Sequence, residues 1–331
     1  MLRCGKTGMV KKQKDYRPEM EKDTEIIRHF RWSDLSQEEG WEAWRNAKIR
    51  ISERVADLAP VAFDNLANPS PDAVAELERR CLLTNHALYH AASEPPTVEA
   101  ASDALVSFAR HFGLLVKEDH RSASELGVVA LRTSSEESQK GYLPYTPRPL
   151  NWHTDGYYNA PDRPVMGFVL HCFRQALAGG ENQLLDPEIA YMRLREENPA
   201  FVRALMHPRA MTIPENREPD GSVRPASVGP VFYPDPATGR LQMRYTARTR
   251  SIEWRDEAVT RAAAEYLREL LMAGDPLMRQ VRLAPGQGIL NNNVLHNRTG
   301  FRDGGTEGET RIILRVRFHV RVAEDCLHGA A

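Results

Sequence analysis

The sequence lacks several features that would place the chain in a specialised class of protein. Its four cysteines, at positions 4, 81, 172 and 326, are scattered and form no CxxC pair. This argues against a disulfide framework or a zinc site and favours reduced thiols, as in a cytosolic protein. No apolar run approaches the roughly 20 residues of a membrane-spanning helix, and the basic N-terminus has no apolar segment of a secretory signal. We therefore expect a cytoplasmic protein without a membrane partner.

An excess of one charge is also missing. The 331 residues include 44 Lys and Arg against 45 Asp and Glu, which gives a formal net charge of −1. A balanced charge provides no general attraction to nucleic acid or to anionic membrane surfaces, so we expect neither as a partner. Hydrophobic residues make up 41% of the chain, which is enough to form a sizeable core.

The chain contains no internal repeat and no linker rich in glycine and serine. Residues 1–25 are polar and charged, and we expect a flexible N-terminal arm there, with a partner-binding tail as the alternative. The absence of a later linker favours a single domain over residues 26–331. Helices are expected early and strands dominate the second half, with one late helix. This order is typical of an α+β protein whose β core is buttressed by helices.

Hydrophobic periodicity and turn residues predict where these elements lie. Helices are expected over residues 71–91, 98–112, 187–207 and 256–272. Strands are expected over residues 128–131, 166–173, 182–186, 241–246, 280–284, 287–293 and 311–320. Pro199 should kink or break the third helix. The segment 208–240, rich in proline, glycine and charge, predicts a long loop of the kind that forms lids or binding loops.

The most informative feature is a pair of potential metal ligands, His153 and Asp155, followed by Gly156. On a strand, side chains two residues apart point to the same face. A chain with 11 His and 45 acidic residues contains about one or two His-x-Asp/Glu pairs by chance, and this is the single such pair in the sequence. By itself the pair also fits an ordinary hydrogen-bonded histidine.

A third ligand occurs far downstream, in Asn291-Asn292-Asn293-Val294-Leu295-His296. Two imidazoles and one carboxylate on one face of a metal are the ligand set of non-haem Fe(II) oxygenases, and they leave the opposite face open for substrate and oxygen. Two alternatives stay open. One is a β-barrel protein that binds a metal without catalysis, and the other is a carbohydrate- or peptide-binding β-sandwich in which His153 and His296 lie far apart.

The strand expected over residues 311–320 has two chemically different faces. Its even-numbered residues from 312 to 318 are apolar, whereas Arg311, Arg315 and Arg317 share the opposite face. This basic face is either exposed to solvent or lines a cavity that binds carboxylates, because a guanidinium matches a carboxylate with two hydrogen bonds. Arg311 follows a glycine-rich loop on a strand that could neighbour the third ligand, and we expect Arg317 to be peripheral.

Together these residues resemble the TauD/TfdA superfamily of Fe(II)- and 2-oxoglutarate-dependent dioxygenases. The resemblance covers roughly residues 125–320 and is nearest to the γ-butyrobetaine hydroxylase branch, which has a Tyr-rich turn, an LHC strand and a GG turn. The corresponding segments here are Asp155-Gly156-Tyr157-Tyr158, Leu170-His171-Cys172, Gly179-Gly180-Glu181-Asn182 and the run Asn293-Val294-Leu295-His296-Asn297-Arg298-Thr299.

The resemblance implies a distorted double-stranded β-helix, or jelly-roll, core over about residues 125–320. It implies that His153, Asp155 and His296 bind Fe(II) and form the catalytic centre. Such an enzyme hydroxylates or desaturates an unactivated C–H bond with O2 and 2-oxoglutarate, giving succinate and CO2. Halogenating relatives lack the carboxylate, so Asp155 favours hydroxylation or desaturation. A degenerate relative without catalysis is the alternative.

The resemblance also implies how the cosubstrate and the substrate are held. Arg311 would bind the distal carboxylate of 2-oxoglutarate, assisted by Asn182. Arg315 is the alternative for that role, and in some relatives the corresponding arginine holds an anionic group of the substrate. Homo-oligomers occur among the relatives, so a homo-oligomer is compatible with the resemblance.

Aromatic side chains gather around the metal pair, at Tyr142, Tyr145, Trp152, Tyr157 and Tyr158. They either pack the mouth of the barrel or hold a quaternary ammonium group by cation–π attraction. Among them, Tyr145 is a loose match to the cage aromatic of the butyrobetaine hydroxylases. We expect a small zwitterionic or anionic substrate, such as a betaine, an amino acid or a short carboxylate.

Overall fold

The computed structural model describes residues 17–118, 124, 126–134, 143–217, 221–248 and 252–322. The chain forms two compact units, Met1–Leu58 and Ala59–Ala331. In the first unit, helix α2 spans Arg17–His29 and helix α3 spans Glu38–Ala56. Residues 17–25 of the expected arm therefore belong to a helix, and residues 1–16 lie outside the described residues. Arg50 of α3 joins the two helices by donating to Asp23 of α2 at 3.0 and 2.5 Å.

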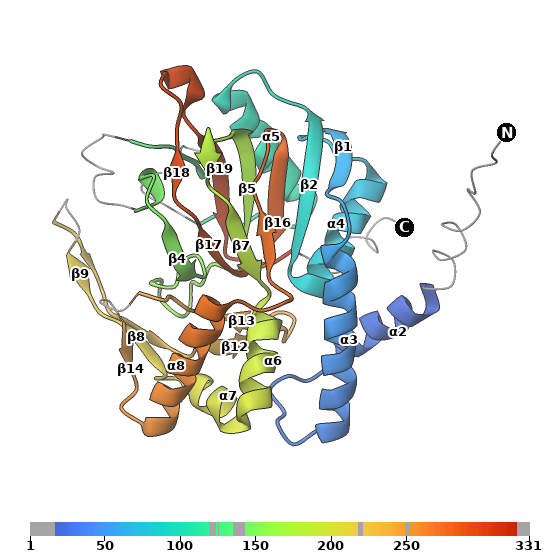
Figure 1. The fold of residues 1–331 in the computed structure, drawn as a ribbon, viewed down its shortest axis with the longest axis vertical. Helices are drawn as coiled ribbons and strands as arrows, with labels where there is room; N and C mark the ends of the chain where they lie inside the picture. The colour runs from blue at the N-terminus through green and yellow to red at the C-terminus, as the bar shows by residue number, and fades with distance from the viewer. Residues whose placement is uncertain are drawn as a thin grey trace. The chain divides into compact units, whose positions relative to one another are not determined.

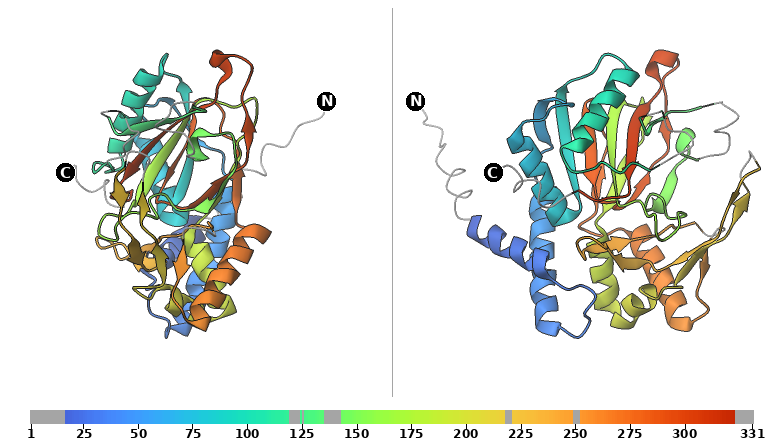
Figure 2. Two further views of the ribbon diagram at one scale, coloured as in Figure 1. Left: turned by 90° about the vertical axis from the view of Figure 1, so that its left-hand side faces the viewer. Right: turned by 180° about the vertical axis from the view of Figure 1, so that it is seen from behind.

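The second unit contains two main sheets (Figures 1 and 2). The larger sheet has, in order, β1 (Val61–Asn65), β2 (His86–Ser93), β16 (Gln287–Asn291), β5 (Gly167–Arg174), β19 (Ile312–Phe318) and β3 (Val128–Leu131). The smaller sheet has β15 (Arg279–Val281), β7 (Asn182–Leu185), β17 (Leu295–Arg298) and β4 (Leu150–His153). Neighbouring strands are antiparallel apart from the parallel pair β1–β2.

The two sheets share one apolar cluster. Leu170 of β5, Ile289 of β16 and Ile313 of β19 pack in the same cluster as Leu184 of β7. Alternate residues of each strand therefore point into the space between the sheets, as the period of two requires. Fully burying an aliphatic side chain of this kind stabilises the fold by about 1.5–3 kcal/mol, so this cluster holds the smaller sheet against the larger one.

The opposite face of the larger sheet is covered by helices α4 (Pro71–Thr84) and α5 (Val98–Arg110). Each helix begins at a side-chain cap, because Ser70 and Thr97 accept hydrogen bonds from backbone N–H groups of the first turn. The apolar residues expected on one face of the last strand, from Ile312 to Phe318, pack in this helix-covered cluster. That part of the sequence prediction is confirmed.

Three further helices lie beside the sheets in the lower half of Figure 1: α6 (Pro187–Glu197), α7 (Pro199–Leu205) and α8 (Ala258–Ala273). The expected break at Pro199 is confirmed. Asn198 ends α6 and caps α7 by accepting from the N–H of Ala200 at 2.9 Å, and Pro199 suits the first helical position because its missing N–H would have no acceptor within the helix.

Two expectations for secondary structure are wrong. The helix expected over residues 71–91 ends at Thr84, because Asn85 takes a left-handed conformation with φ 58° and caps the helix. The chain then continues as strand β2 in the larger sheet. The expected loop 208–240 contains short strands, namely β8 (Met211–Ile213), β9 (Asn216–Arg217), β10 (Val223–Arg224), β11 (Ser227–Gly229) and β12 (Phe232–Pro234).

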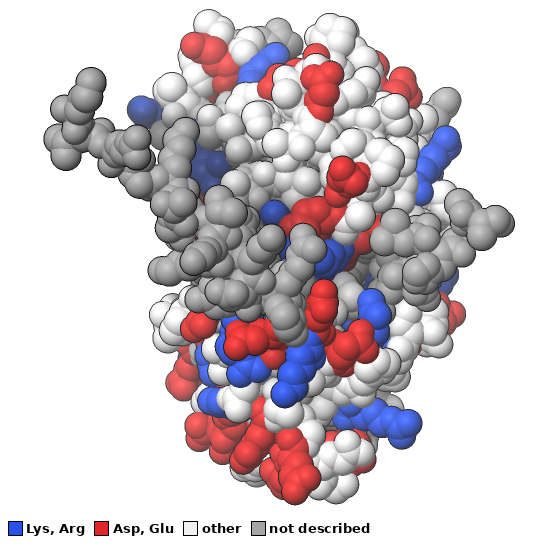
Figure 3. All heavy atoms as spheres, turned by 90° about the vertical axis from the view of Figure 1, so that its right-hand side faces the viewer, with Lys and Arg blue, Asp and Glu red and all other residues white. Residues whose placement is uncertain are grey.

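The remaining short strands complete the fold. They are β6 (Ala178–Gly179) with β18 (Phe301–Arg302), β13 (Leu241–Met243) with β12, and β14 (Glu253–Trp254) with β8. On the face drawn in Figure 3, acidic and basic side chains are interspersed, in keeping with the net charge of −1. Within the described part of the chain, no helix has the length and apolar character to cross a membrane.

The close approach of β16 to its neighbours makes Gly288 a test of the sheet. A Cβ atom there would lie 2.1 Å from Cζ of Tyr89 and 2.4 Å from the carbonyl oxygen of Leu170. Gly288→Ala should therefore lower the free energy of unfolding by about 1–3 kcal/mol, as measured by urea denaturation. Gly305→Ala is the matched control, since its Cβ would meet nothing within 4 Å. An equal loss in both variants would contradict the packing described here.

Candidate metal centre

Two strands of the smaller sheet bring the two candidate histidines together. Strands β4 and β17 are antiparallel neighbours in which His153 lies opposite His296, and their ring centroids are 4.3 Å apart. With Asp155 they form a group whose potential ligand atoms all lie within 4.8 Å of one another. The alternative of a β-sandwich that keeps the two histidines far apart is therefore excluded.

Asp155 reaches this group by a different route from the one expected. Strand β4 ends at His153, so Asp155 lies in the following turn, and the argument from strand alternation is wrong for this pair. Thr154 between them is anchored on both sides, because its N–H donates to the carbonyl oxygen of Tyr245 at 3.0 Å and its Oγ1 accepts from the N–H of Tyr245 at 3.0 Å. These two hydrogen bonds fix the point at which the chain leaves strand β4.

Asn293 holds the backbone of Asp155 directly. Its Oδ1 accepts from the N–H of Asp155 at 2.7 Å, and its Nδ2 donates to the carbonyl oxygens of Asp155 at 2.9 Å and Val165 at 2.7 Å. Asn293 is buried and has φ 55°, a left-handed conformation that asparagine tolerates better than most residues. The sequence run of three asparagines marked this segment, but its role in placing Asp155 could not be deduced from it.

Gly156 completes the turn. Its φ is 65°, and a Cβ there would lie 2.4 Å from Cγ2 of Val165. Any other residue would be strained by this backbone conformation, and its Cβ would also clash with the side chain of Val165. The glycine that follows the metal pair therefore allows the turn that points Asp155 at the two histidines.

Backbone carbonyl groups orient both imidazole rings. Nδ1 of His153 lies 2.8 Å from the carbonyl oxygen of Asn151, and Nδ1 of His296 lies 2.9 Å from that of Val294. A carbonyl oxygen can only accept, so each Nδ1 carries the proton and donates it. Each Nε2 is then left with a lone pair, which is the arrangement that metal-binding histidines use.

The electrostatic surroundings set the protonation states that a metal requires. Burial, followed by the nearby His296, lowers the pKa of His153 to about 3, and burial also lowers the pKa of His296. Burial tends to raise the pKa of Asp155, but the positive charges of Arg315 and Arg317 outweigh it and hold that pKa below its ordinary value. Two neutral imidazoles and one carboxylate are therefore available, and they fit a divalent iron ion.

The basic face of β19 lies inside the protein. Arg311, Arg315 and Arg317 are 5%, 8% and 5% exposed, so the solvent-exposed interpretation is wrong, and the cavity that binds carboxylates stays a prediction. Nη1 of Arg315 donates to both carboxylate oxygens of Asp155, at 3.0 and 3.1 Å. This arginine therefore contacts a candidate metal ligand directly.

Arg317 is not peripheral, contrary to the expectation. It forms an ion pair with the buried Glu118, it donates from Nη1 to the hydroxyl of Tyr158 at 3.3 Å, and the same nitrogen lies 3.9 Å from Oδ1 of Asp155. Glu118 was not predicted from the sequence, because its ion pair with Arg317 joins two segments that are far apart in the chain. Arg317 thus adds a second positive charge beside Asp155.

Arg311 lies at the other end of the same face. Its backbone N–H donates to Oδ1 of Asp303 at 2.8 Å, and its guanidinium carbon lies 4.9 Å from the ring centroid of Phe301. The guanidinium forms no hydrogen bond with any residue that the structure describes. Burial lowers its pKa to about 10, so it stays a buried cation that lacks an anion to donate to.

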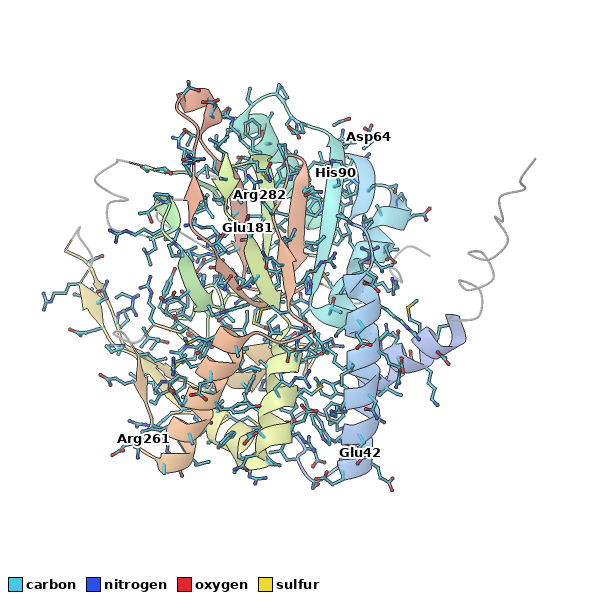
Figure 4. All side chains as sticks on the ribbon, in the orientation of Figure 1. Glu42, Asp64, His90, Glu181, Arg261 and Arg282 are labelled. Carbon is cyan, nitrogen blue, oxygen red and sulfur yellow. The ribbon has the colours of Figure 1, made fainter. Side chains whose placement is uncertain are left out.

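The Gly179-Gly180 turn lies beside Arg311, and Asn182 follows this turn in the chain. Asn182 is buried at the start of β7, and a Cβ on Gly180 would lie 3.5 Å from Nε of Arg311. Arg282 holds the turn by donating to the carbonyl oxygens of Ala176 and Gly179 at 2.7 and 3.1 Å; Figure 4 labels Arg282 close to Glu181. The structure therefore brings the GG turn and Arg311 together.

The candidate aromatics divide into three groups. Tyr157 lies edge-on to His153 with ring centroids 6.4 Å apart, and Tyr158 packs edge-on against Tyr157 at 5.2 Å. Tyr145 is instead buried in the apolar cluster between the sheets, where its hydroxyl has no hydrogen-bond partner among the described residues. Trp152 is buried, and Tyr142 lies outside the described residues. Of the candidate aromatics that the structure describes, Tyr157 and Tyr158 are therefore the ones at the metal group; Phe168, which was not predicted, also packs against His296 with ring centroids 5.0 Å apart.

Asn293 provides a test of how Asp155 is positioned. Asn293→Asp keeps an acceptor for the N–H of Asp155 but removes both donated hydrogen bonds and places a negative charge beside two carbonyl oxygens. We expect the affinity for Mn²⁺, measured by electron paramagnetic resonance, to fall by about 10–100-fold, as is usual when a residue supporting a metal ligand is changed. Asn297→Asp, which alters an amide bonded to Gln183, is the control. Unchanged Mn²⁺ affinity in Asn293→Asp would contradict this role.

Comparison with known proteins gives two results at the sequence level. Residues 95–317 match the family model of the taurine catabolism dioxygenase TauD, TfdA family. The chain is also 31% identical over 159 residues to a uridine-5'-phosphate dioxygenase from Amycolatopsis sp, a match that covers 46% of this chain and 55% of that protein. The match therefore spans about half the length of this curated relative.

Solved structures share the fold. An asparagine oxygenase in complex with Fe(II), 2S,3S-3-hydroxyasparagine and succinate is 18% identical with a TM-score of 0.53, and 90% of this chain and 91% of that chain are covered. The non-heme iron oxygenase OrfP in complex with Fe is 17% identical with a TM-score of 0.54, with 85% and 91% covered. The family model covers most of the second unit and includes the His153, Asp155 and His296 group. The chain therefore belongs to the TauD/TfdA family of dioxygenases, whose members use Fe(II) and 2-oxoglutarate.

Proposed function

We propose that the protein is an Fe(II)- and 2-oxoglutarate-dependent oxygenase that hydroxylates or desaturates a C–H bond of a small anionic or zwitterionic molecule. Iron bound with 2-oxoglutarate supplies the oxidising power, and the cosubstrate leaves as succinate and CO2. The observation that carries the proposal is the convergence of the potential ligand atoms of His153, Asp155 and His296 within 4.8 Å of one another.

In this proposal the protein side chains bind and orient rather than react. His153 and His296 would each offer Nε2, because their Nδ1 atoms are engaged with backbone carbonyls. Asp155 would offer one carboxylate oxygen, and Nη1 of Arg315, which donates to both oxygens of this carboxylate, would hold it in place. Three protein ligands on one side of a metal leave the other side open for cosubstrate, oxygen and substrate.

We propose that the two sheets are the halves of a distorted double-stranded β-helix. The support is that both sheets contribute alternate residues to one apolar cluster and that the ligands come from β4 and β17 of the smaller sheet. The basic face of β19, from the larger sheet, points into the same space. Such a core would enclose the site between two rigid surfaces, which favours precise placement of the reacting groups.

The cosubstrate would lie along the inner face of β19. Arg311 would hold its distal carboxylate, with Asn182 assisting, since this guanidinium is buried without a hydrogen-bond partner in the described structure. The alternative, Arg315, already donates to Asp155, and this supports Arg311 over Arg315. Arg315 would then face the metal end of the pocket, where it could also meet an anionic group of the substrate.

Positive charge beside Tyr157 supports an anionic substrate. Thr246, which follows strand β13, forms an isolated bridge with His153, which places Arg248, two residues on, near the metal group. The charges of Arg248 and Arg224 both act on the phenol of Tyr157, and the guanidinium of Arg224 lies 5.7 Å from the ring centroid of Tyr158. An amino acid, a short carboxylate or, given the uridine-5'-phosphate dioxygenase, a nucleoside 5'-monophosphate would suit this charge.

The class of reaction is tested by succinate formation. With Fe(II), O2 and 2-oxoglutarate, the wild-type protein should release succinate, and His153→Ala should lower the rate by at least about 100-fold, because one of three metal ligands is lost. His90→Ala is the matched control, since His90 is exposed on β2 (Figure 4). Turnover retained in His153→Ala would contradict the proposal, and metal binding without any succinate would favour the non-catalytic alternative.

The charge of the substrate is tested with matched pairs. Amino acids against their amides, and uridine 5'-monophosphate against uridine, should be compared for their stimulation of succinate release. We expect stimulation by the member that carries the carboxylate or phosphate, and at least about tenfold less by the partner without that group, which loses a charge-assisted hydrogen bond. Equal stimulation by both members of every active pair would contradict an anionic substrate.

A further inference from the structure

A second buried arginine accompanies Arg311 at the far end of the pocket. The guanidinium carbon of Arg298 lies 4.7 Å from the ring centroid of Phe301, and that of Arg311 lies 4.9 Å from the same centroid. Arg298 is 4% exposed and Arg311 is 5% exposed. Two guanidiniums therefore share one aromatic ring in the interior of the second unit.

The strand register turns Arg298 toward the pocket. Arg298 follows His296 by two residues on β17, so both side chains leave the same face of the strand. On the neighbouring strand, Asn182 lies directly opposite Arg298 and Leu184 opposite His296, and Leu184 belongs to the cluster between the sheets. Arg298, Asn182 and Arg311 thus converge on one region.

The hydrogen bonds of Arg298 leave part of its guanidinium free. Nη2 donates to the carbonyl oxygens of Thr146 and Arg148, the first at 2.9 Å. Nε is buried and has no partner among the described residues. A buried donor without an acceptor costs about 1–3 kcal/mol, and a ligand oxygen at this place would remove that cost.

The local charge is not balanced by the protein side chains described around it. The carboxylate of Asp303 attracts both guanidiniums, but its oxygens accept from the backbone N–H of Arg311 at 2.8 Å and from Oγ1 of Thr133 at 2.9 Å. One carboxylate beside two guanidiniums leaves an excess positive charge in a buried place. Buried charges are normally paired, so this end of the pocket suits a further anion.

We propose that Arg298 is a second guanidinium of the pocket for the distal carboxylate of 2-oxoglutarate, and that it donates to this carboxylate through Nε. The inference rests on the proposed function. It assigns a binding role to Arg298, two positions after His296. The hydrogen bonds that Arg298 forms with Thr146 and Arg148 explain it only as an anchor for that part of the chain. It makes the pocket selective for a 2-oxo acid with a carboxylate at its far end.

The two roles of Arg298 are separated by comparing two ligands. 2-Oxoglutarate and 2-oxovalerate offer the same keto and C1 carboxylate groups to the metal, but 2-oxovalerate has no distal carboxylate. Dissociation constants for both are measured anaerobically on the Fe(II)-loaded wild-type protein and on Arg298→Gln. Arg302→Gln, on the exposed position of β18, is the matched control, and Mn²⁺ affinity without any 2-oxo acid reports on the metal group.

We expect Arg298→Gln to weaken 2-oxoglutarate binding by about tenfold or more, the loss typical of a hydrogen bond between charged groups. The binding of 2-oxovalerate and of Mn²⁺ should stay within about twofold, because neither uses the distal pocket. Arg298→Lys, which keeps the charge, should recover part of the lost affinity, and Arg302→Gln should match the wild type.

Three results would overturn the inference. Unchanged 2-oxoglutarate affinity in Arg298→Gln would remove Arg298 from the pocket. An equal loss for 2-oxoglutarate and Mn²⁺ would show that Arg298 acts through the chain that leads to His153. Failure of the Fe(II)-loaded wild-type protein to bind 2-oxoglutarate would overturn the proposed function as well, so the two failures are distinguishable.

Discussion

The antiparallel pairing of β17 with β4 on one side and β7 on the other is the constraint on which the site depends. The first pairing sets His296 opposite His153, and the second sets Arg298 opposite Asn182. One strand therefore carries a candidate metal ligand at one position and a buried cation two residues later. Because side chains alternate, a slip of one residue would turn both away from the interior. Asn293, in the turn before β17, ties the same segment to Asp155, so the third ligand depends on this pairing as well.

The second feature of the site is the burial of positive charge. Arg298, Arg311, Arg315 and Arg317 all lie on inward faces and are each at most 8% exposed. Burying a charge is costly unless it is paired, and the protein pairs these side chains unequally. Arg315 and Arg317 contact the carboxylates of Asp155 and Glu118, whereas Arg298 and Arg311 form no ion pair with a carboxylate among the described residues and are only attracted by the charge of Asp303. In the proposed function, one end of the site would hold a metal and the other would hold an anion, at some cost in stability.

The sequence predicted which residues form the candidate site better than it predicted the contacts that position them. The His-x-Asp pair, the distant His296 and the apolar face of β19 were visible because short spacings and a period of two leave a local signal. The sequence did not reveal the turn at Asp155, the amide of Asn293 or the partner of Arg317. These features depend on contacts between segments that are far apart in the chain; Asp155 and Asn293, for example, are 138 residues apart. Strand β2 was predicted as the end of a helix because the apolar residues in 71–91 fit a helical period as well as a strand period. The left-handed conformation of Asn85 and the pairing of β2 with β16 decide in favour of the strand. Pairing in a sheet is a tertiary property that local propensity does not encode.

The central claim is that three side chains from β4, its following turn and β17 meet around one iron ion. A crystal structure of the Fe(II)-loaded protein, with anomalous scattering recorded at the iron absorption edge, tests it most directly. The account predicts one peak with Nε2 of His153, Nε2 of His296 and a carboxylate oxygen of Asp155 at about 2.0–2.2 Å, the length of ordinary bonds from such ligands. An iron peak elsewhere, or one that contacts only two of the three, would contradict it.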